Sequence, residues 1–154
     1  MIYFAYRSDL SPAEMMARCP GYRSAGVARL PDHRLVFRRF SRLQRGAVAG
    51  FESSTGDVVW GALYDIADHE LPILHHQEGY LAEGPASLNE ADFREVTVVR
   101  LGGSEAVKAH AYVPVPDNTG GLPSRAYVDA MIAGAAHHGL PKAWIVSLQG
   151  LKAT

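Results

Sequence analysis

Apolar runs and short polar breaks alternate along the first two thirds of the chain. Residues 2–6 form an apolar run typical of a buried strand, and it ends abruptly in polar residues. Turn sequences such as Pro31-Asp32 and Thr55-Gly56-Asp57 separate further strand-like runs. The pattern predicts strands over residues 2–6, 24–29, 34–40, 47–51, 58–66, 93–101 and 107–115.

Apolar spacing of the helical period and capping residues predict the helices. One helix covers about Asp68–Glu78, with Asp68 as N-cap and Gly79 after its last residue. Ser124 caps a second helix that ends at Gly139, and shorter helices are expected over residues 13–18 and 141–148. Because strands dominate the early chain and the longer helices come later, we expect an α+β fold with a curved or barrel-like sheet.

Composition and charge narrow the range of functions. The chain has 154 residues, and we expect a single domain spanning residues 1–154. The formal net charge of −1 provides no overall field for nucleic acid or an anionic membrane, so neither is expected as a partner. Cys19 is the only cysteine, and the sequence shows neither a secretion signal nor a membrane-spanning run. We therefore expect a cytoplasmic location and no intrachain disulfide.

Glu78 is the candidate for acid and base chemistry. Leu71, Leu74, His75 and Glu78 are spaced at i, i+3, i+4 and i+7, so they share one face of the predicted helix. Burial and the negative end of the helix would both raise the pKa of this carboxyl, which suits proton transfer near neutral pH. The alternative is a glutamate at a fraying helix end that faces solvent or pairs with an arginine.

Other catalytic arrangements have little support in the sequence. No serine occupies a nucleophile elbow, and Cys19 has no evident partner. His75 and Glu78 have the spacing of a metal-binding pair, but HExxH and CxxC motifs are lacking, so we expect no metal. The segment "YFAYRSDL" (residues 3–10) is a strand that ends in a polar turn, which can present backbone N–H groups to an anion or a carbonyl. A plain strand end is the alternative.

Five segments, taken together in their order, are similar to the motifs of one protein family. They are "YFAYRSDL", "GDVVWGALYDI", "LHHQEGY", "AHAYV" and "PSRAYVDAMIAGAAHHGLP". The chain thereby resembles the gamma-glutamylcyclotransferase family, including its AIG2-like bacterial members, over nearly its whole length. The family motifs are commonly written Y-G-S-N-L, V-W-G-x-L-Y, a Glu just before Gly, and P-S-x-x-Y followed by G-A-x-x-x-G-L-P.

The resemblance implies a fold and a reaction. The fold is a small mixed β-barrel of about six or seven strands with flanking helices. In the reaction, the α-amine of a gamma-glutamyl amine or amide attacks its own side-chain carbonyl, which releases the amine and 5-oxoproline without a cofactor. The acid/base glutamate of the family corresponds to Glu78, and Tyr127 matches the tyrosine of P-S-x-x-Y, where it binds substrate or packs in the core. The loop that holds the glutamyl group corresponds to Tyr3, Phe4, Ala5, Tyr6, Arg7 and Ser8.

Two residues of this first loop depart from the family pattern. Arg7 stands in place of Gly, and Asp9 stands in place of Asn. Glycine would permit a positive φ or a close backbone approach to the ligand, neither of which arginine readily allows. The main hypothesis is an enzyme that acts on a small-molecule gamma-glutamyl substrate. The alternative is a family member that binds a small metabolite or partner without turnover, and a homodimer is also left open.

Overall fold

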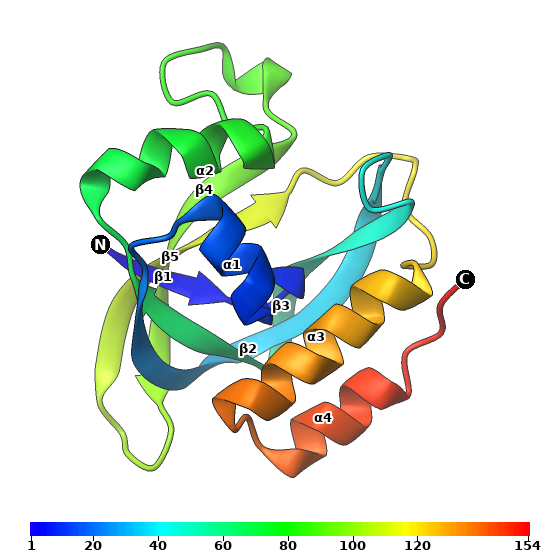
Figure 1. Ribbon diagram of the computed structural model, residues 1–154. Coiled ribbons are helices and arrows are strands. Elements are labelled where there is room, and N and C mark those ends of the chain that lie inside the picture. Colours follow the sequence, from blue (N-terminus) through cyan, green and yellow to red (C-terminus); the bar gives the residue numbers. More distant parts are fainter.

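Five β-strands close into a barrel in the computed structural model, which describes residues 1–154 (Figure 1). The order around the barrel is β1-β3-β2-β4-β5, and β1 closes it by pairing in parallel with β5, where Tyr3 lies opposite His110. All other neighbouring strands are antiparallel. The expected α+β fold with a small mixed barrel is therefore confirmed. The strands are β1 (Ile2–Ala5), β2 (Arg23–Ser41), β3 (Gly46–Asp65), β4 (Ala91–Arg100) and β5 (Ala106–Pro114).

The barrel has five strands, and not six or seven, because two pairs of predicted strands merge. The predicted strands over residues 24–29 and 34–40 are both part of β2. Those over residues 47–51 and 58–66 belong to β3, which ends at Asp65. The two long strands form one bent hairpin whose register shifts at three places. Such shifts let a strand curve around a small barrel without being interrupted.

The turn sequences that suggested extra strand ends form a bulge in this hairpin. Residues 54–57 of β3 lie opposite Asp32 alone, because the residues on either side of Asp32 pair with Ser53 and Val58. Asp32 adopts a φ of 59°, and its Oδ1 accepts the Gly56 N–H at 2.9 Å. Asp tolerates this left-handed conformation better than most residues. The turn residues therefore bend the hairpin without ending it.

Helices cover the outside of the barrel, and α3 and α4 lie side by side against one side of it (Figure 1). None of the helices is both long enough and apolar enough to cross a membrane. The α-helices are α1 (Pro12–Arg18), α2 (Leu71–Glu78), α3 (Arg125–His138) and α4 (Lys142–Gln149). Three short 3₁₀ helices cover Ser8–Leu10, Asp68–Glu70 and Ala86–Leu88.

Three of the predicted helix boundaries are confirmed by their hydrogen bonds and backbone angles. The Ser124 side chain caps α3 by accepting the Tyr127 N–H at 3.2 Å. Gly139 ends α3 with a φ of 72°, and Gly79 ends α2 with a φ of 73°. Glycine adopts this left-handed conformation without steric cost, which explains why both helices stop there.

The predicted N-cap at Asp68 is wrong. Asp68 lies inside the 3₁₀ helix that precedes α2, and no side chain caps that turn. The Glu70 N–H donates to the Ala67 carbonyl at 3.0 Å, so the backbone itself satisfies the donor that a cap would have used. The helical segment over residues 68–78 therefore begins as a 3₁₀ turn and continues as α2.

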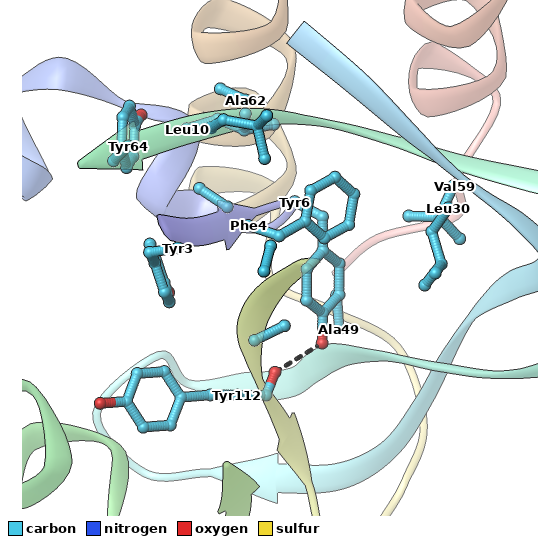
Figure 2. Close-up of a cluster of buried hydrophobic side chains, with 14 of the residues drawn as sticks. Tyr3, Phe4, Tyr6, Leu10, Leu30, Ala49, Val59, Ala62, Tyr64 and Tyr112 are labelled. Carbon is cyan, nitrogen blue, oxygen red and sulfur yellow. Dashed lines mark hydrogen bonds between the residues drawn. The ribbon is translucent and has the colours of Figure 1, made fainter. Parts of the chain in front are cut away.

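The short strand β1 lies at the centre of the hydrophobic core (Figure 2). Tyr3, Phe4 and Tyr6 are at most 1% exposed. The Tyr6 hydroxyl donates to the Tyr112 carbonyl of β5 at 2.8 Å, a bond drawn in Figure 2. Because β1 pairs with strands on both edges and its side chains are buried, it gives the residues that follow it a rigid point of attachment.

Candidate active site

A cavity of about 470 Å³ lies where β1 ends, a size that suits a small-molecule ligand. It collects side chains from the loop after β1, α1, the β2–β3 hairpin, the end of α2 and α3. Four of the residues predicted for the site meet there, namely Arg7, Ser8, Glu78 and Tyr127. The other lining residues are Asp9, Arg18, Arg39, Phe40, Ser41, Arg42, Leu43, Gln44, Val48, Gln77, Glu90, Ala91 and Pro114.

Glu78 is the last residue of α2, and its side chain is 9% exposed. The buried Leu74 lies one turn earlier on the same face of the helix, as the spacing predicted. The helix end is well defined, because the Tyr80 N–H donates to the His75 carbonyl at 2.9 Å beyond the left-handed Gly79. Glu78 is therefore a buried carboxylate on a fixed helix end, and the alternative that it faces solvent is excluded.

Two arginines hold the Glu78 carboxylate, one at each oxygen, so the arginine pairing named in the alternative is confirmed. Arg18 of α1 donates from Nη1 to Oε1 at 2.7 Å. Arg7, which follows β1, places its Nη2 3.0 Å from Oε2. The side chains of Arg7 and Arg18 are only 7% and 14% exposed, so these contacts are shielded from solvent. Buried ion pairs interact far more strongly than surface ones because water does not screen them.

The expected direction of the Glu78 pKa shift is wrong. Burial does raise the pKa of this carboxyl, as anticipated, but Arg7 and Arg18 outweigh burial and hold the pKa below its ordinary value. The error has a simple cause: neither arginine lies on α2, and the sequence pattern of the helix contains no sign of them. Glu78 is consequently ionised at neutral pH, and each of its oxygens contacts one arginine.

Known proteins share both the sequence and the fold of this chain. Residues 58–148 match the AIG2-like family. Gamma-glutamylcyclotransferase of Bos taurus is 31% identical over 148 residues, which are 91% of this chain and 72% of that protein. Gamma-glutamylcyclotransferase of Mus musculus is 28% identical over 155 residues, covering 98% and 78% of the two chains. A solved structure named gamma-glutamyl cyclotransferase has a TM-score of 0.89 at 26% identity, and covers 100% of this chain and 89% of that one.

This chain belongs to the gamma-glutamylcyclotransferase family. The resemblance seen in the motifs is thereby confirmed, and the cavity can be compared with the motif that the family shares. Arg7 occupies the glycine position of that motif. Its φ is −115°, a value that any residue adopts, so the backbone of this family member does not need glycine there. What arginine adds at this position is its side chain, which lines the cavity.

Asp9, the second departure from the family motif, supports the loop that carries Arg7. Its Oδ1 accepts the Arg7 N–H at 3.0 Å, and its Oδ2 accepts the hydroxyl of Tyr3. The same oxygen lies 3.9 Å from Arg7 Nη2. Asp9 is 1% exposed, so its charge is directed at neighbouring groups of the chain. The two departures are thus coupled, because the added aspartate charge lies beside the added arginine.

Glu14 of α1 is part of the same charged cluster, and sequence analysis did not single it out. Its Oε1 accepts the Ser8 hydroxyl at 3.2 Å and lies 3.3 Å from Nη2 of Arg18. Its Oε2 is buried without a hydrogen-bond partner. Burial raises the pKa of Glu14, although Arg18 opposes the shift. The i, i+4 spacing of Glu14 and Arg18 was the available signal, but the helix that carries them is short and its inner face could not be assigned.

Of the other predicted site residues, Tyr127 reaches the cavity, whereas the four from Tyr3 to Tyr6 do not line it. Tyr127 lines the cavity from α3 and is 3% exposed, and its hydroxyl oxygen accepts the Ala49 N–H at 3.1 Å. It therefore packs in the core at the cavity wall. Substrate binding stays a prediction for Tyr3, Phe4 and Ala5 of β1 and for Tyr6 after it, because their side chains are buried in the core.

Replacing Tyr127 by Phe is expected to lower the free energy of unfolding by about 1–3 kcal/mol, because the buried Ala49 N–H loses its acceptor. Urea unfolding followed by circular dichroism measures the change. Tyr22→Phe, at a half-buried tyrosine, is the control and should change stability by less than about 0.5 kcal/mol. Equal stability of Tyr127→Phe and the wild type would contradict the assigned hydrogen bond.

Proposed function

We propose that this protein is a gamma-glutamylcyclotransferase that converts a gamma-glutamyl amine or amide into 5-oxoproline and the free amine. The α-amine of the substrate is the nucleophile, so the protein has to bind the substrate in a bent conformation, move protons and stabilise the charge that develops on the amide oxygen. No nucleophilic side chain is required. Membership of the family supports this reaction.

The observation that carries the proposal is the position of the Glu78 carboxylate. It is buried in a ligand-sized cavity and lies directly against the first loop of the family motif, 3.0 Å from Arg7. A carboxylate next to the loop expected to hold the glutamyl group is within reach of that group's α-amine. Close placement of the proton acceptor and the reacting amine is the first requirement of general base catalysis.

Glu78 would carry the protons of the reaction in turn. It takes a proton from the α-ammonium, and the resulting amine attacks the side-chain carbonyl to form the new C–N bond of the ring. The attacking nitrogen loses a second proton, and the leaving nitrogen gains two protons as its C–N bond breaks. The products are 5-oxoproline and the protonated amine, so charge and protons balance.

The test is to incubate the purified protein with a panel of gamma-glutamyl amino acids, gamma-glutamyl amines and glutathione, and to measure 5-oxoproline by mass spectrometry. We expect at least one member of the panel to be cyclised at a rate proportional to protein concentration. If no member yields 5-oxoproline above the rate without protein, the proposal is wrong.

A second candidate function is binding of a small metabolite without turnover. The pairing of both Glu78 oxygens with arginines favours it, because the two guanidinium groups stabilise the ionised carboxylate and so weaken it as a base. The two candidates differ in what a ligand does to the Arg7 contact. An enzyme requires the ligand to separate Arg7 from Glu78, whereas a binding protein can retain the ion pair.

The pH dependence of turnover should reveal the depressed pKa of Glu78. The base must be ionised, so kcat/KM is expected to stay high on the acid side until the pH falls below the ordinary glutamate pKa of about 4.3. A positive neighbour favours the charged carboxylate, so Arg18→Gln should raise the pKa of Glu78. The fall of kcat/KM on the acid side of the pH profile (the acid limb) should then move to higher pH. Arg18→Lys retains the charge and should leave the limb near its wild-type position. Superimposable acid limbs in wild type and Arg18→Gln would contradict the role of Glu78 as the titrating base.

A further inference from the structure

Arg7 carries a hydrogen-bond donor that no group of the chain uses. Its side chain is 7% exposed and lines the cavity, and its Nε is buried without an acceptor. Buried donors in proteins are nearly always hydrogen-bonded. The Nε atom itself has no exposed surface, so we infer that a ligand in the cavity supplies its acceptor when the guanidinium turns away from Glu78. Because arginine is always charged and its planar group matches a carboxylate, a carboxylate is the best partner.

The backbone of the same residue is not free for this role. The Arg7 N–H donates to Asp9 Oδ1 at 3.0 Å, so it cannot bind a ligand unless that bond is broken. At this residue the unpaired donor therefore belongs to the guanidinium and not to the backbone. It also lies beside the proposed base, with Nη2 3.0 Å from Glu78 Oε2.

We propose that Arg7 and Glu78 together bind the zwitterionic α-amino-acid group of the substrate, with its carboxylate on Arg7 and its ammonium on Glu78. This inference rests on the proposed function, whose gamma-glutamyl substrate carries both charges on one carbon atom. The ion pair of the free protein opens, and each partner takes the opposite charge of the ligand. Arg7 then determines specificity, which a glycine at this position could not do.

The charges around the cavity explain why a zwitterion is preferred to a simple amine. Arg7 and Arg18 face the carboxylates of Asp9, Glu14 and Glu78 in one chain of ion pairs. A ligand with an ammonium group alone would take over Glu78 but supply no anion to Arg7, which would keep only Asp9, 3.9 Å away, as a counter-ion. A zwitterion brings its own carboxylate for Arg7 and its own ammonium for Glu78. Both residues of the separated ion pair therefore keep a counter-ion.

The same exchange prepares Glu78 for proton transfer. In the free protein two guanidinium groups stabilise its ionised form. Once Arg7 has moved to the substrate carboxylate, its place beside Glu78 is taken by the ammonium, which unlike the guanidinium can release a proton. The proton then passes from the ammonium nitrogen to Oε2, the oxygen that Arg7 has vacated. Substrate binding and placement of the ammonium beside the base are thus one event.

The test compares two substrates that differ only in the α-carboxylate. One is the gamma-glutamyl amide that is cyclised best, and the other is the 4-aminobutanoyl amide of the same amine, which would close to 2-pyrrolidone. We expect the wild type to prefer the first by about 100-fold in kcat/KM, and Arg7→Gln to lose most of this preference. Arg7→Lys keeps the charge and should retain part of the preference for the gamma-glutamyl amide. Methylguanidinium supplies the missing charged group, so about 10 mM of it should restore part of the preference to Arg7→Gly.

Several results would overturn the inference. One is a wild type that cyclises both substrates equally well, which can be recognised without any variant. Another is Arg7→Gln losing activity on both substrates by the same factor, as a purely structural role would produce. A third is Arg7→Gly turning over faster with an unchanged preference, which would make Arg7 an obstruction.

Calorimetry separates this inference from the proposed function. L-Glutamine carries both charges, whereas 4-aminobutanamide lacks the carboxylate. Suppose that no substrate is cyclised, but that the wild type binds L-glutamine more tightly than 4-aminobutanamide and Arg7→Gln removes this difference in affinity. The zwitterion site is then supported, whereas the proposed reaction is refuted. If the wild type neither cyclises any substrate nor binds L-glutamine in preference, the zwitterion site is refuted as well.

Discussion

Glu78→Gln is expected to reduce 5-oxoproline formation by about 10³-fold or more, because an amide cannot accept the proton of the substrate ammonium. Initial rates with the best gamma-glutamyl substrate measure the loss. Glu78→Asp keeps the carboxylate but draws it back by one methylene, so it should retain more activity than Glu78→Gln. Glu95→Gln makes the same chemical change at an exposed residue of β4 and should leave the rate unchanged.

Stability has to be measured alongside activity, because Glu78 is also a structural partner. Removing its charge leaves the buried guanidinium groups of Arg7 and Arg18 without their shared counter-ion, at a cost of about 3–5 kcal/mol in the free energy of unfolding. Circular dichroism should still show a folded protein at the assay temperature. Turnover in folded Glu78→Gln within tenfold of the wild type would refute Glu78 as the base.

The position of Glu78 could be predicted from the sequence because it depends on local geometry. The spacing from Leu71 to Glu78 defines one helix face, and the glycine that follows Glu78 defines the helix end. Both features involve residues within two turns of each other. The local sequence is therefore enough to predict that the Glu78 carboxylate lies on the buried face at the end of α2.

The electrostatic state of Glu78 could not be predicted in the same way. Arg18 is 60 residues away from Glu78 in the sequence, and Arg7 lies still further away, in the loop after β1. Which charges meet depends on how α1, α2 and the end of β1 pack together, and no periodic pattern encodes that. The departure of Arg7 from the family motif was visible, but its contact with Glu78 was not.

The strand count shows the same limit. The turn sequences Pro31-Asp32 and Thr55-Gly56-Asp57 correctly predicted a local bend in the hairpin near Asp32. Whether a bend ends a strand depends on whether pairing resumes beyond it, and here β2 and β3 pair again on both sides of the bulge. Local signals identify the bend, whereas the partner strand decides whether the chain continues in the sheet.

Gly134→Ala is expected to lower the free energy of unfolding by about 2–3 kcal/mol through overpacking. Gly134 lies in the middle of α3, where alanine would normally stabilise a helix by about 0.5–1 kcal/mol. A Cβ atom at this position would approach within 2.6 Å of the Leu10 carbonyl oxygen, and Leu10 is fully buried. The backbone at Leu10 cannot move aside as a flexible side chain would, so α3 or the turn over Ser8–Leu10 has to shift.

The effect should reach the active site because that turn begins directly after Arg7. A displaced turn moves the guanidinium away from Glu78, so KM for the gamma-glutamyl substrate should rise together with the loss of stability in urea. Gly121→Ala is the matched control, since a Cβ there meets no atom within 4 Å. It should change stability by less than about 0.5 kcal/mol. If Gly134→Ala proved as stable as the wild type or more so, helix propensity would outweigh packing, and the close contact between α3 and the loop would be wrong.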